Sequence, residues 1–322
     1  MNTKENTVYI PEVDPTYVAW GDHDFLKSIL QRRRFFPAYI AGPTGSGKSV
    51  MVEQVCAELG RQYCRIQITP ETDEDSLIGG IRLQNGTTVF KDGPVIDAMR
   101  TGAVLMIDEI DRGSNKIMCL QGVMEGKPVT IKRTGEVVTP HPDFTVVATG
   151  NTKGRGDDSG KYMAAVIIDD AFLERFPVVF EHDYPIRAIE EKILANHMKK
   201  YDCESELVHQ SLIRWAEKNR ANAEEDDTVI STRRLCLIVE SFSFFKDKTD
   251  GDIVAIEYAT NRFEKEDQLA LMAMYKAVRP DVQAEIRVRE LQDNLDDAVS
   301  QTKSQADDIA AKIIRDYKAT KA

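Results

Sequence analysis

The sequence predicts an α/β fold in which a parallel sheet core is followed by a small all-α domain and a C-terminal helical extension. In residues 1–185, short runs of β-prone apolar residues alternate with helical patterns, as in parallel α/β sheets. In residues 186–280 only helical patterns occur, and residues 281–322 continue as a charged helical tail. At 322 residues the chain is long enough for more than one domain.

The predicted strands are continuous runs rich in β-prone residues. Such runs are typical of strands covered on both faces. The five runs are Tyr39–Ala41, Arg65–Ile68, Val104–Asp108, Thr145–Ala148 and Val178–Phe180. Two β-hairpins are predicted as insertions, one at Ile81–Phe90, where Asn85-Gly86 favours a tight turn, and one at Val129–Val138.

The all-α part begins after Pro185. Ser231 or Thr232 is suited to cap its third helix, and Pro280 is expected to end the series. The predicted helices are Ile186–Lys199, Glu206–Asn219, Thr232–Phe244, Ile253–Phe263 and Glu266–Val278. Between residues 285 and 317 apolar residues recur mostly at steps of three or four positions, which predicts an amphipathic helix. We expect its apolar stripe to pack within the chain; contact with a partner is the alternative.

The composition narrows the function classes. The net charge of −11 argues against a protein that holds nucleic acid by its overall field, although a local basic lining stays open. Neither an apolar run of about 18 residues nor a signal-peptide core is present, so we expect a cytoplasmic protein without a membrane span. The five cysteines are scattered and the five histidines are unpaired, which argues against zinc and indicates structural or surface roles.

The segment between the first predicted strand and the next helical pattern fits the phosphate-binding pattern G-x-x-x-x-G-K-[ST]. It reads Gly42-Pro43-Thr44-Gly45-Ser46-Gly47-Lys48-Ser49. Its glycines allow backbone N–H groups to turn toward phosphate oxygens, and the following helix start favours anions. Lys48 is then predicted to reach the β- and γ-phosphates of a nucleotide, and Ser49 to bind Mg²⁺.

Polar residues end two further predicted strands. Asp108 and Glu109 follow a buried run; Asp108 is predicted to complete the Mg²⁺ site with Ser49, and Glu109 to act as general base toward the attacking water. Asn151 ends the next strand, where its amide is suited to the γ-phosphate or the water. Arg175 and Arg233 are candidate charge donors to the transferred phosphoryl group.

Taken in order, these motifs resemble the AAA+ ATPases of the MoxR and dynein-related branch, and within it the CobS-type ATPase subunits of cobaltochelatase. The likeness extends over roughly residues 8–185 and is specific because several segments occur in the same order. Besides the phosphate-binding loop, these are Ile10–Pro15, Phe90–Pro94, Ile107–Asp111, Pro140–Pro142 and Asn151–Asp157.

The resemblance implies a role for each candidate residue. Lys48 and Ser49 belong to the Walker A motif, Asp108 and Glu109 to Walker B, and Asn151 is sensor 1. Arg175 is implied to be an arginine finger for the nucleotide of a neighbouring subunit. Arg233 is implied to be sensor 2 on the helical lid, with Arg234 as the alternative.

The resemblance also implies an ATPase that uses ATP and Mg²⁺, forms a homo-oligomer that we expect to be a hexameric ring, and remodels a protein substrate or a von Willebrand A-type adaptor. Its hairpins would face the ring pore. Two alternatives stay open. One is a nucleic-acid motor, with Lys127, Lys132 and Arg133 near a hairpin as contacts. The other is a nucleotide-gated scaffold with little turnover.

Overall fold

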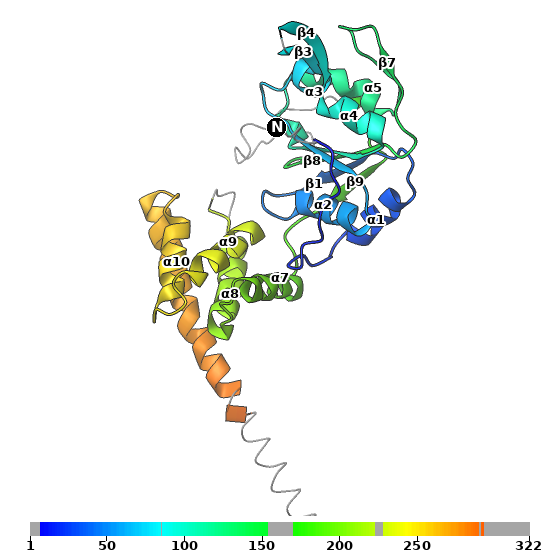
Figure 1. The fold of residues 1–322 in the computed structure, drawn as a ribbon. Helices are drawn as coiled ribbons and strands as arrows, with labels where there is room; N and C mark the ends of the chain where they lie inside the picture. The colour runs from blue at the N-terminus through cyan, green and yellow to red at the C-terminus, as the bar shows by residue number, and fades with distance from the viewer. Residues whose placement is uncertain (1–6, 85, 154–169, 223–227, 290, 293–322) are drawn as a thin grey trace, which may run out of the picture.

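The structure is a computed structural model, and it describes residues 7–84, 86–153, 170–222, 228–289 and 291–292. Figure 1 shows an α/β part followed by a group of helices. The predicted tail beyond residue 292 and Asn85 of the predicted turn lie outside the described residues.

A five-stranded parallel sheet forms the centre of the α/β part. Its strands are β1 (Ala38–Ala41), β2 (Tyr63–Gln67), β5 (Val104–Asp108), β8 (Thr145–Gly150) and β9 (Val178–Glu181), in the spatial order β2-β5-β8-β1-β9. Every neighbouring pair is parallel. All five predicted strands are therefore confirmed, with ends that differ by two residues at most.

Helices cover both faces of the sheet. On one face α1 and α2 pack against alternate strand residues such as Ile40 and Met106, and on the other α4 and α5 pack against Leu105 and Ile107. Both faces are apolar because each is covered, which explains why the strands read as continuous apolar runs. The helices of this part are α1 (His23–Gln31), α2 (Lys48–Glu58), α3 (Glu74–Leu77), α4 (Pro94–Thr101), α5 (Gln121–Met124) and α6 (Asp170–Leu173), with 3₁₀ turns η1 (Ile110–Arg112) and η2 (Asn115–Leu120).

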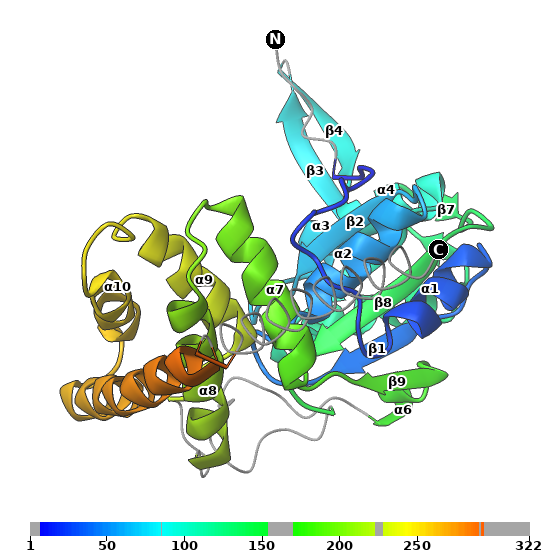
Figure 2. The ribbon, with the colours of Figure 1, turned by 90° about the horizontal axis from the view of Figure 1, so that it is seen from below.

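Both predicted hairpins are present. Strands β3 (Gly79–Gln84) and β4 (Thr87–Asp92) form a six-residue antiparallel pair that stands out from the α/β part (Figure 2). Strands β6 (Val129–Thr130) and β7 (Val137–Val138) form the second, with only two residues each. Ion pairs of Lys132 with Glu74 and of Arg133 with Asp75 connect the second hairpin to α3, which precedes the first.

The second part is helical, as predicted, and has its own apolar core. Its helices are α7 (Arg187–Lys200), α8 (Glu206–Asn222), α9 (Thr232–Ser243), α10 (Gly251–Thr260) and a long helix over residues 265–289. Trp215 and Tyr275 are fully buried in this core with their rings edge to face, and the Trp215 indole N–H donates to the Leu271 carbonyl at 3.1 Å. We refer to this group of helices as the lid. No helix among the described residues is both long and apolar enough to cross a bilayer.

The expectation that Pro280 ends the helical series is wrong, because the last helix continues through it to residue 289 (Figure 2). Contacts on both sides hold the helix in place. Val278 and Val282 are buried, and Arg214 of α8 forms two hydrogen bonds to the Glu285 carboxylate. Pro280 itself is exposed, so its ring points to solvent and the packing outweighs the lost backbone hydrogen bond.

Because Pro280 lies inside a continuous helix, Pro280→Ala should stabilise the lid. Proline is about 3 kcal/mol less favourable than alanine in a helix interior, and we expect about 1–3 kcal/mol of this in the protein. Thermal unfolding followed by circular dichroism measures the effect, with the exposed Lys276→Ala of the same helix as the control. A midpoint that falls below that of the parent protein would contradict the continuous helix.

Candidate functional site

The phosphate-binding loop and the two polar strand ends meet at one edge of the sheet. Strands β1, β5 and β8 are adjacent and parallel, with Ile107 beside Ala148 and Ala41 beside Gly150. The residues that follow these strands are therefore neighbours at the carboxyl edge, where ligands bind in open α/β sheets. The structure thus brings together the loop over residues 42–49, Asp108, Glu109 and Asn151.

The backbone of the loop requires glycine at three positions. Gly45 and Gly47 have φ angles of 80° and 104°, which side chains rarely adopt, and Gly47 precedes the first turn of α2. A Cβ atom on Gly42 would lie 2.0 Å from the His182 carbonyl oxygen. The tight turn leaves the helix start, with its unpaired N–H groups, at the carboxyl edge.

Lys48 is a buried cation surrounded by neutral oxygen atoms. Its side chain is 8% exposed, and its Nζ donates to the carbonyls of Gly42 at 2.7 Å and Pro43 at 2.9 Å and to Asn151 Oδ1 at 3.3 Å. Burial lowers the pKa of Lys48 to about 8, although the nearby charge of Asp108 opposes the shift. A cation held in this way fits an anionic ligand, because a phosphate would supply the negative charge that these partners lack.

Asp108 is the centre of a hydrogen-bonded group at the end of β5. Its Oδ1 accepts hydrogen bonds from Ser49 Oγ at 3.0 Å and Thr149 Oγ1 at 2.5 Å, and Arg65 Nε donates to its Oδ2 at 3.1 Å. Burial raises the pKa of Asp108, but the hydrogen bonds from Thr149 and Arg65 outweigh it, so the pKa lies below its usual value. An ionised carboxylate beside a hydroxyl is a suitable oxygen pair for Mg²⁺. The described residues contain no cluster of three His, Cys, Asp or Glu that would offer a different metal site.

Glu109 is held in a conformation that is uncommon for a residue with a side chain. Its φ of 56° and ψ of 44° lie in the left-handed region. Its N–H donates to Thr149 Oγ1 at 3.3 Å, and its carboxylate accepts from Gln67 Nε2 at 2.9 Å and pairs with Arg112. Since Thr149 also donates to Asp108, one buried hydroxyl fixes both acidic residues relative to each other.

Asn151 is fixed through its backbone by Asp111, four residues downstream of Ile107. The Asp111 carboxylate is fully buried, and its Oδ2 accepts hydrogen bonds from the N–H groups of Asn151 at 2.7 Å and Thr152 at 3.0 Å. The Asn151 side chain is then directed to the loop, where its Oδ1 accepts from Thr44 Oγ1 at 3.2 Å as well as from Lys48.

The two arginines predicted for the site lie in different places. The backbone N–H of Arg233, in the first turn of α9, donates to the Gly45 carbonyl at 3.2 Å, so the lid brings Arg233 to the loop. Arg175 follows α6 and forms an ion pair with Glu125, with Nη2–Oε1 and Nε–Oε1 distances of 2.9 and 3.0 Å. It lies three residues before β9, at the amino ends of the strands, whereas the loop lies at their carboxyl ends.

His182 lies next to the loop and is buried, in the structural role that the sequence left open for the histidines. It follows β9, its N–H donates to the Ala41 carbonyl at 2.8 Å, and its ring stacks on Trp20 with centroids 4.3 Å apart. Burial and the nearby Lys48 charge lower the pKa of His182 to about 4, so the ring is neutral at physiological pH. His182 therefore packs against the start of the loop as an uncharged residue.

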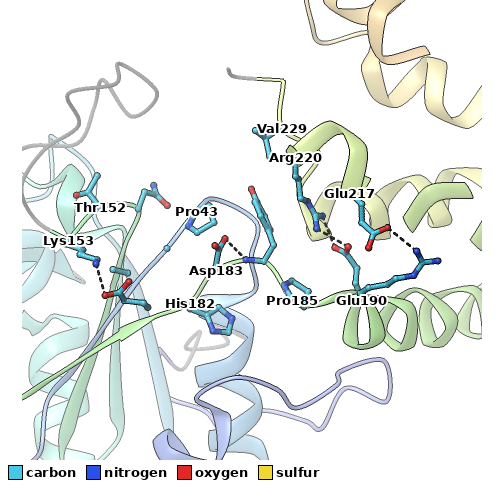
Figure 3. A pocket seen from close by; sticks show the side chains of 16 residues that line it. Pro43, Thr152, Lys153, His182, Asp183, Pro185, Glu190, Glu217, Arg220 and Val229 are labelled. Carbon is cyan, nitrogen blue, oxygen red and sulfur yellow. Dashed lines mark hydrogen bonds and ion pairs between the residues drawn. The ribbon is translucent and has the colours of Figure 1, made fainter. Parts of the chain in front are cut away.

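A cavity of about 830 Å³ opens between this edge of the sheet and the lid (Figure 3). The loop contributes Gly42 and Pro43, and the lid contributes a row of charged side chains. Figure 3 shows that Arg220 of the lid is paired with Glu190, and that Lys153 of the α/β part is paired with Glu181. The cavity thus extends the loop site toward the lid.

The pKa of Lys48 predicts how phosphate binding depends on pH. The protonated amine binds the anion, so the affinity for ATP should fall by about tenfold per pH unit above about pH 8 and stay level below it. Titrations with a fluorescent nucleotide between pH 6.5 and 9.5 measure this dependence. Lys48→Arg is the control, because the arginine side chain stays charged throughout this range. That variant should bind more weakly but with a flat profile; the same slope in both proteins would contradict the assignment.

Comparisons with known proteins agree with this geometry. Residues 37–169 match the model of the AAA domain of the dynein-related subfamily. The chain is 31% identical over 253 residues to the aerobic cobaltochelatase subunit CobS of Sinorhizobium sp., which is 74% of each chain. It is 27% identical to the protein CbbQ of Hydrogenophilus thermoluteolus, over 58% of this chain and 68% of CbbQ. It is 31% identical to the protein NorQ of Paracoccus denitrificans, over 49% of this chain and 57% of NorQ.

The family match covers the loop site and four of the five strands, all except β9, and the similarity to CobS extends into the lid. Both agree with the order of motifs found in the sequence and with the parallel sheet that carries them. The chain therefore belongs to the AAA+ ATPases, in the MoxR-type, dynein-related group.

Proposed function

We propose that this ATPase forms a homo-oligomeric ring, hexameric as in the implied family pattern, in which Mg²⁺-dependent ATP hydrolysis at subunit boundaries remodels a partner protein. The observation that carries the proposal is the separation between the loop and Arg175. The loop follows β1, whereas Arg175 precedes β9, and these strands are parallel neighbours with Ala38 beside Val178. Four strand residues, or about 13 Å, lie between the two edges.

A guanidinium stabilises a transferred phosphoryl group only at hydrogen-bond distance. Arg175 is turned toward Glu125 at the opposite edge, so its own subunit's loop is out of reach. A second copy that places this edge against the carboxyl edge of the first would supply the guanidinium. Such head-to-tail contacts close into rings when the rotation between subunits permits.

Each residue of the site has its own role at the phosphates. Lys48 and the N–H groups of the loop bind the β- and γ-phosphates, and Ser49 and Asp108 hold Mg²⁺, which neutralises phosphate charge. Glu109 accepts the proton of the attacking water, and Asn151 orients that water or the γ-phosphate. Arg233 adds positive charge from the lid. Because phosphoryl transfer requires mainly positioning and charge neutralisation, this set of groups is sufficient.

A protein partner is supported by the first hairpin and by the relatives. Ile81 and Leu83 on β3 are 49% and 77% exposed, so apolar side chains stand on a projecting hairpin where a partner chain would meet them. CobS is by its name a subunit of a cobaltochelatase, that is, one component of a larger assembly. We infer a protein substrate or a von Willebrand A-type adaptor, with cobaltochelatase-like activity as the closest model.

A nucleic-acid motor is the weaker candidate. Lys127, Lys132 and Arg133 were the expected contacts, but each is paired with a carboxylate of the same chain: Glu125, Glu74 and Asp75. The net charge of −11 adds long-range repulsion. Stimulation of turnover by DNA that is lost at high salt would favour this candidate. A scaffold with little turnover would release no phosphate in a simple assay.

Mixing of two inactive variants tests the shared site. Arg175→Ala should lower turnover by about 10³–10⁵, the usual effect of an arginine finger, while nucleotide affinity is largely retained. Glu109→Gln should be inactive because its general base is lost. Mixed assemblies contain boundaries with an intact Glu109 on one side and an intact Arg175 on the other, so the mixture should recover activity, measured as phosphate release.

The control for this experiment is Arg112→Ala, which removes a half-buried arginine of the same chain that pairs with Glu109 at 3.4 Å. It should retain far more activity than Arg175→Ala. Full activity of Arg175→Ala alone, or a mixture as inactive as its components, would exclude a shared site.

Glu109→Gln also tests the partner class. The variant should bind ATP without hydrolysing it, so a ring that grips its partner in the ATP state should retain that partner. Affinity purification with ATP, followed by mass spectrometry, should recover a specific protein that Lys48→Ala, which cannot bind nucleotide, does not recover. Recovery of nuclease-sensitive material instead of a protein would favour the nucleic-acid motor.

A further inference from the structure

The lid and the segment that leads into it contact the phosphate-binding loop at two consecutive carbonyl groups. Tyr184, in the segment between β9 and α7, donates its hydroxyl to the Thr44 carbonyl at 3.1 Å. Arg233, at the start of α9, donates its backbone N–H to the Gly45 carbonyl at 3.2 Å. The Ser231 side chain is so close that a Cβ on Gly45 would lie 2.6 Å from its Oγ. The lid therefore lies against the backbone of the loop itself.

These carbonyls belong to the peptide units that would bind phosphate. A trans peptide is planar, so the Thr44 carbonyl and the Gly45 N–H turn together, as do the Gly45 carbonyl and the Ser46 N–H. In a loop of this kind the N–H groups face the phosphates. Whatever orients the two N–H groups also orients the two carbonyls on the other side of the same planes.

A buried ion pair connects the two lid contacts to each other. Arg220 of α8 donates from both terminal nitrogens to Glu190 of α7 at 2.9 and 2.7 Å, and Glu190 is only 1% exposed (Figure 3). The Arg220 guanidinium lies 4.4 Å from the centroid of the Tyr184 ring, in a cation–π contact. On the other side, Thr232 Oγ1 donates to Glu190 at 2.6 Å, next to Arg233.

The two parts of the chain have separate apolar cores, so the polar contacts between them help to set their relative orientation. The apolar core of the lid consists of residues between 194 and 275, and the two cores flanking the sheet consist of residues between 26 and 180. The two parts thus fold around separate cores. Their relative orientation is set by contacts at the boundary, and the pair at Thr44 and Gly45 lies at the phosphate site.

We propose that Tyr184 is a positioning residue that, supported by the Glu190–Arg220 pair, couples phosphate binding to lid orientation through the peptide units of the loop. This inference rests on the proposed nucleotide site. Phosphate binding fixes the Thr44–Gly45 and Gly45–Ser46 peptide planes, and the fixed carbonyls then hold Tyr184 and α9. The coupling acts through the loop backbone and is separate from any contact between the Arg233 side chain and the nucleotide.

The Arg233 amide reports on this coupling directly, because its hydrogen crosses the boundary to the Gly45 carbonyl. Hydrogen exchange of the full chain, resolved to this amide by mass spectrometry, is measured with and without ADP. In the parent protein ADP should slow the exchange of the Gly45 and Ser46 amides and of the Arg233 amide. In Tyr184→Phe the slowing at Arg233 should be smaller by about 2- to 10-fold, the usual effect of one neutral hydrogen bond.

Tyr258→Phe is the matched control, since it removes the hydroxyl of an exposed tyrosine on α10. It should leave the effect of ADP unchanged. Glu190→Gln is the second variant: it keeps the shape of the side chain but removes its charge, and should likewise reduce the slowing at Arg233 while the amides of the loop stay protected.

The outcomes separate the inference from the proposed function. If ADP protects neither the loop nor Arg233 in the parent protein, the nucleotide site is wrong and the coupling falls with it. If ADP protects both equally in the parent protein, Tyr184→Phe and Glu190→Gln, the nucleotide site stands and the coupling is overturned. Loss of the lid fold in either variant would show in the exchange of the buried Trp215 segment without ADP.

Discussion

The parallel register of β1, β5 and β8 is the constraint on which the site depends. It places Gly42, Glu109 and Asn151, which lie far apart in the sequence, at one edge of the sheet. The register is maintained by apolar packing on both faces, where Ile40 and Met106 meet α1 and α2 and Leu105 and Ile107 meet α4 and α5. A shift of one residue in β5 would exchange these faces and withdraw both acidic side chains.

Two buried side chains hold the polar residues at the carboxyl ends of these strands in place. Thr149 is wholly buried and joins the carboxylate of Asp108 to the backbone of Glu109. Asp111, also buried, holds the backbone at Asn151. Such buried hydrogen bonds are costly to break, so the acidic and amide groups are fixed before a ligand arrives. Preorganisation of this kind is what phosphoryl transfer asks of a protein.

The sequence was sufficient for the strands and for the residues that directly follow them, because continuous apolar runs and the glycine pattern are local signals. It was not sufficient for the residues that support them. Arg65 and Thr149 act only because their strands flank β5, and His182 acts only because β9 lies beside β1. No local pattern encodes which strands are neighbours. Pro280 shows the opposite case, in which a strong local signal is overruled by tertiary packing at Val278 and Val282.

The ion pair between Arg175 and Glu125 has a consequence for how the proposed assembly forms. The Arg175 side chain is 22% exposed and neutralised within its own subunit, so a lone subunit does not present a bare guanidinium to solvent or to stray anions. In an assembly of the proposed kind, the arginine must exchange one carboxylate for a phosphate, and that exchange is nearly balanced in charge. The contact between subunits would then respond to the state of the nucleotide, because ADP offers less negative charge than ATP to draw the arginine away from Glu125.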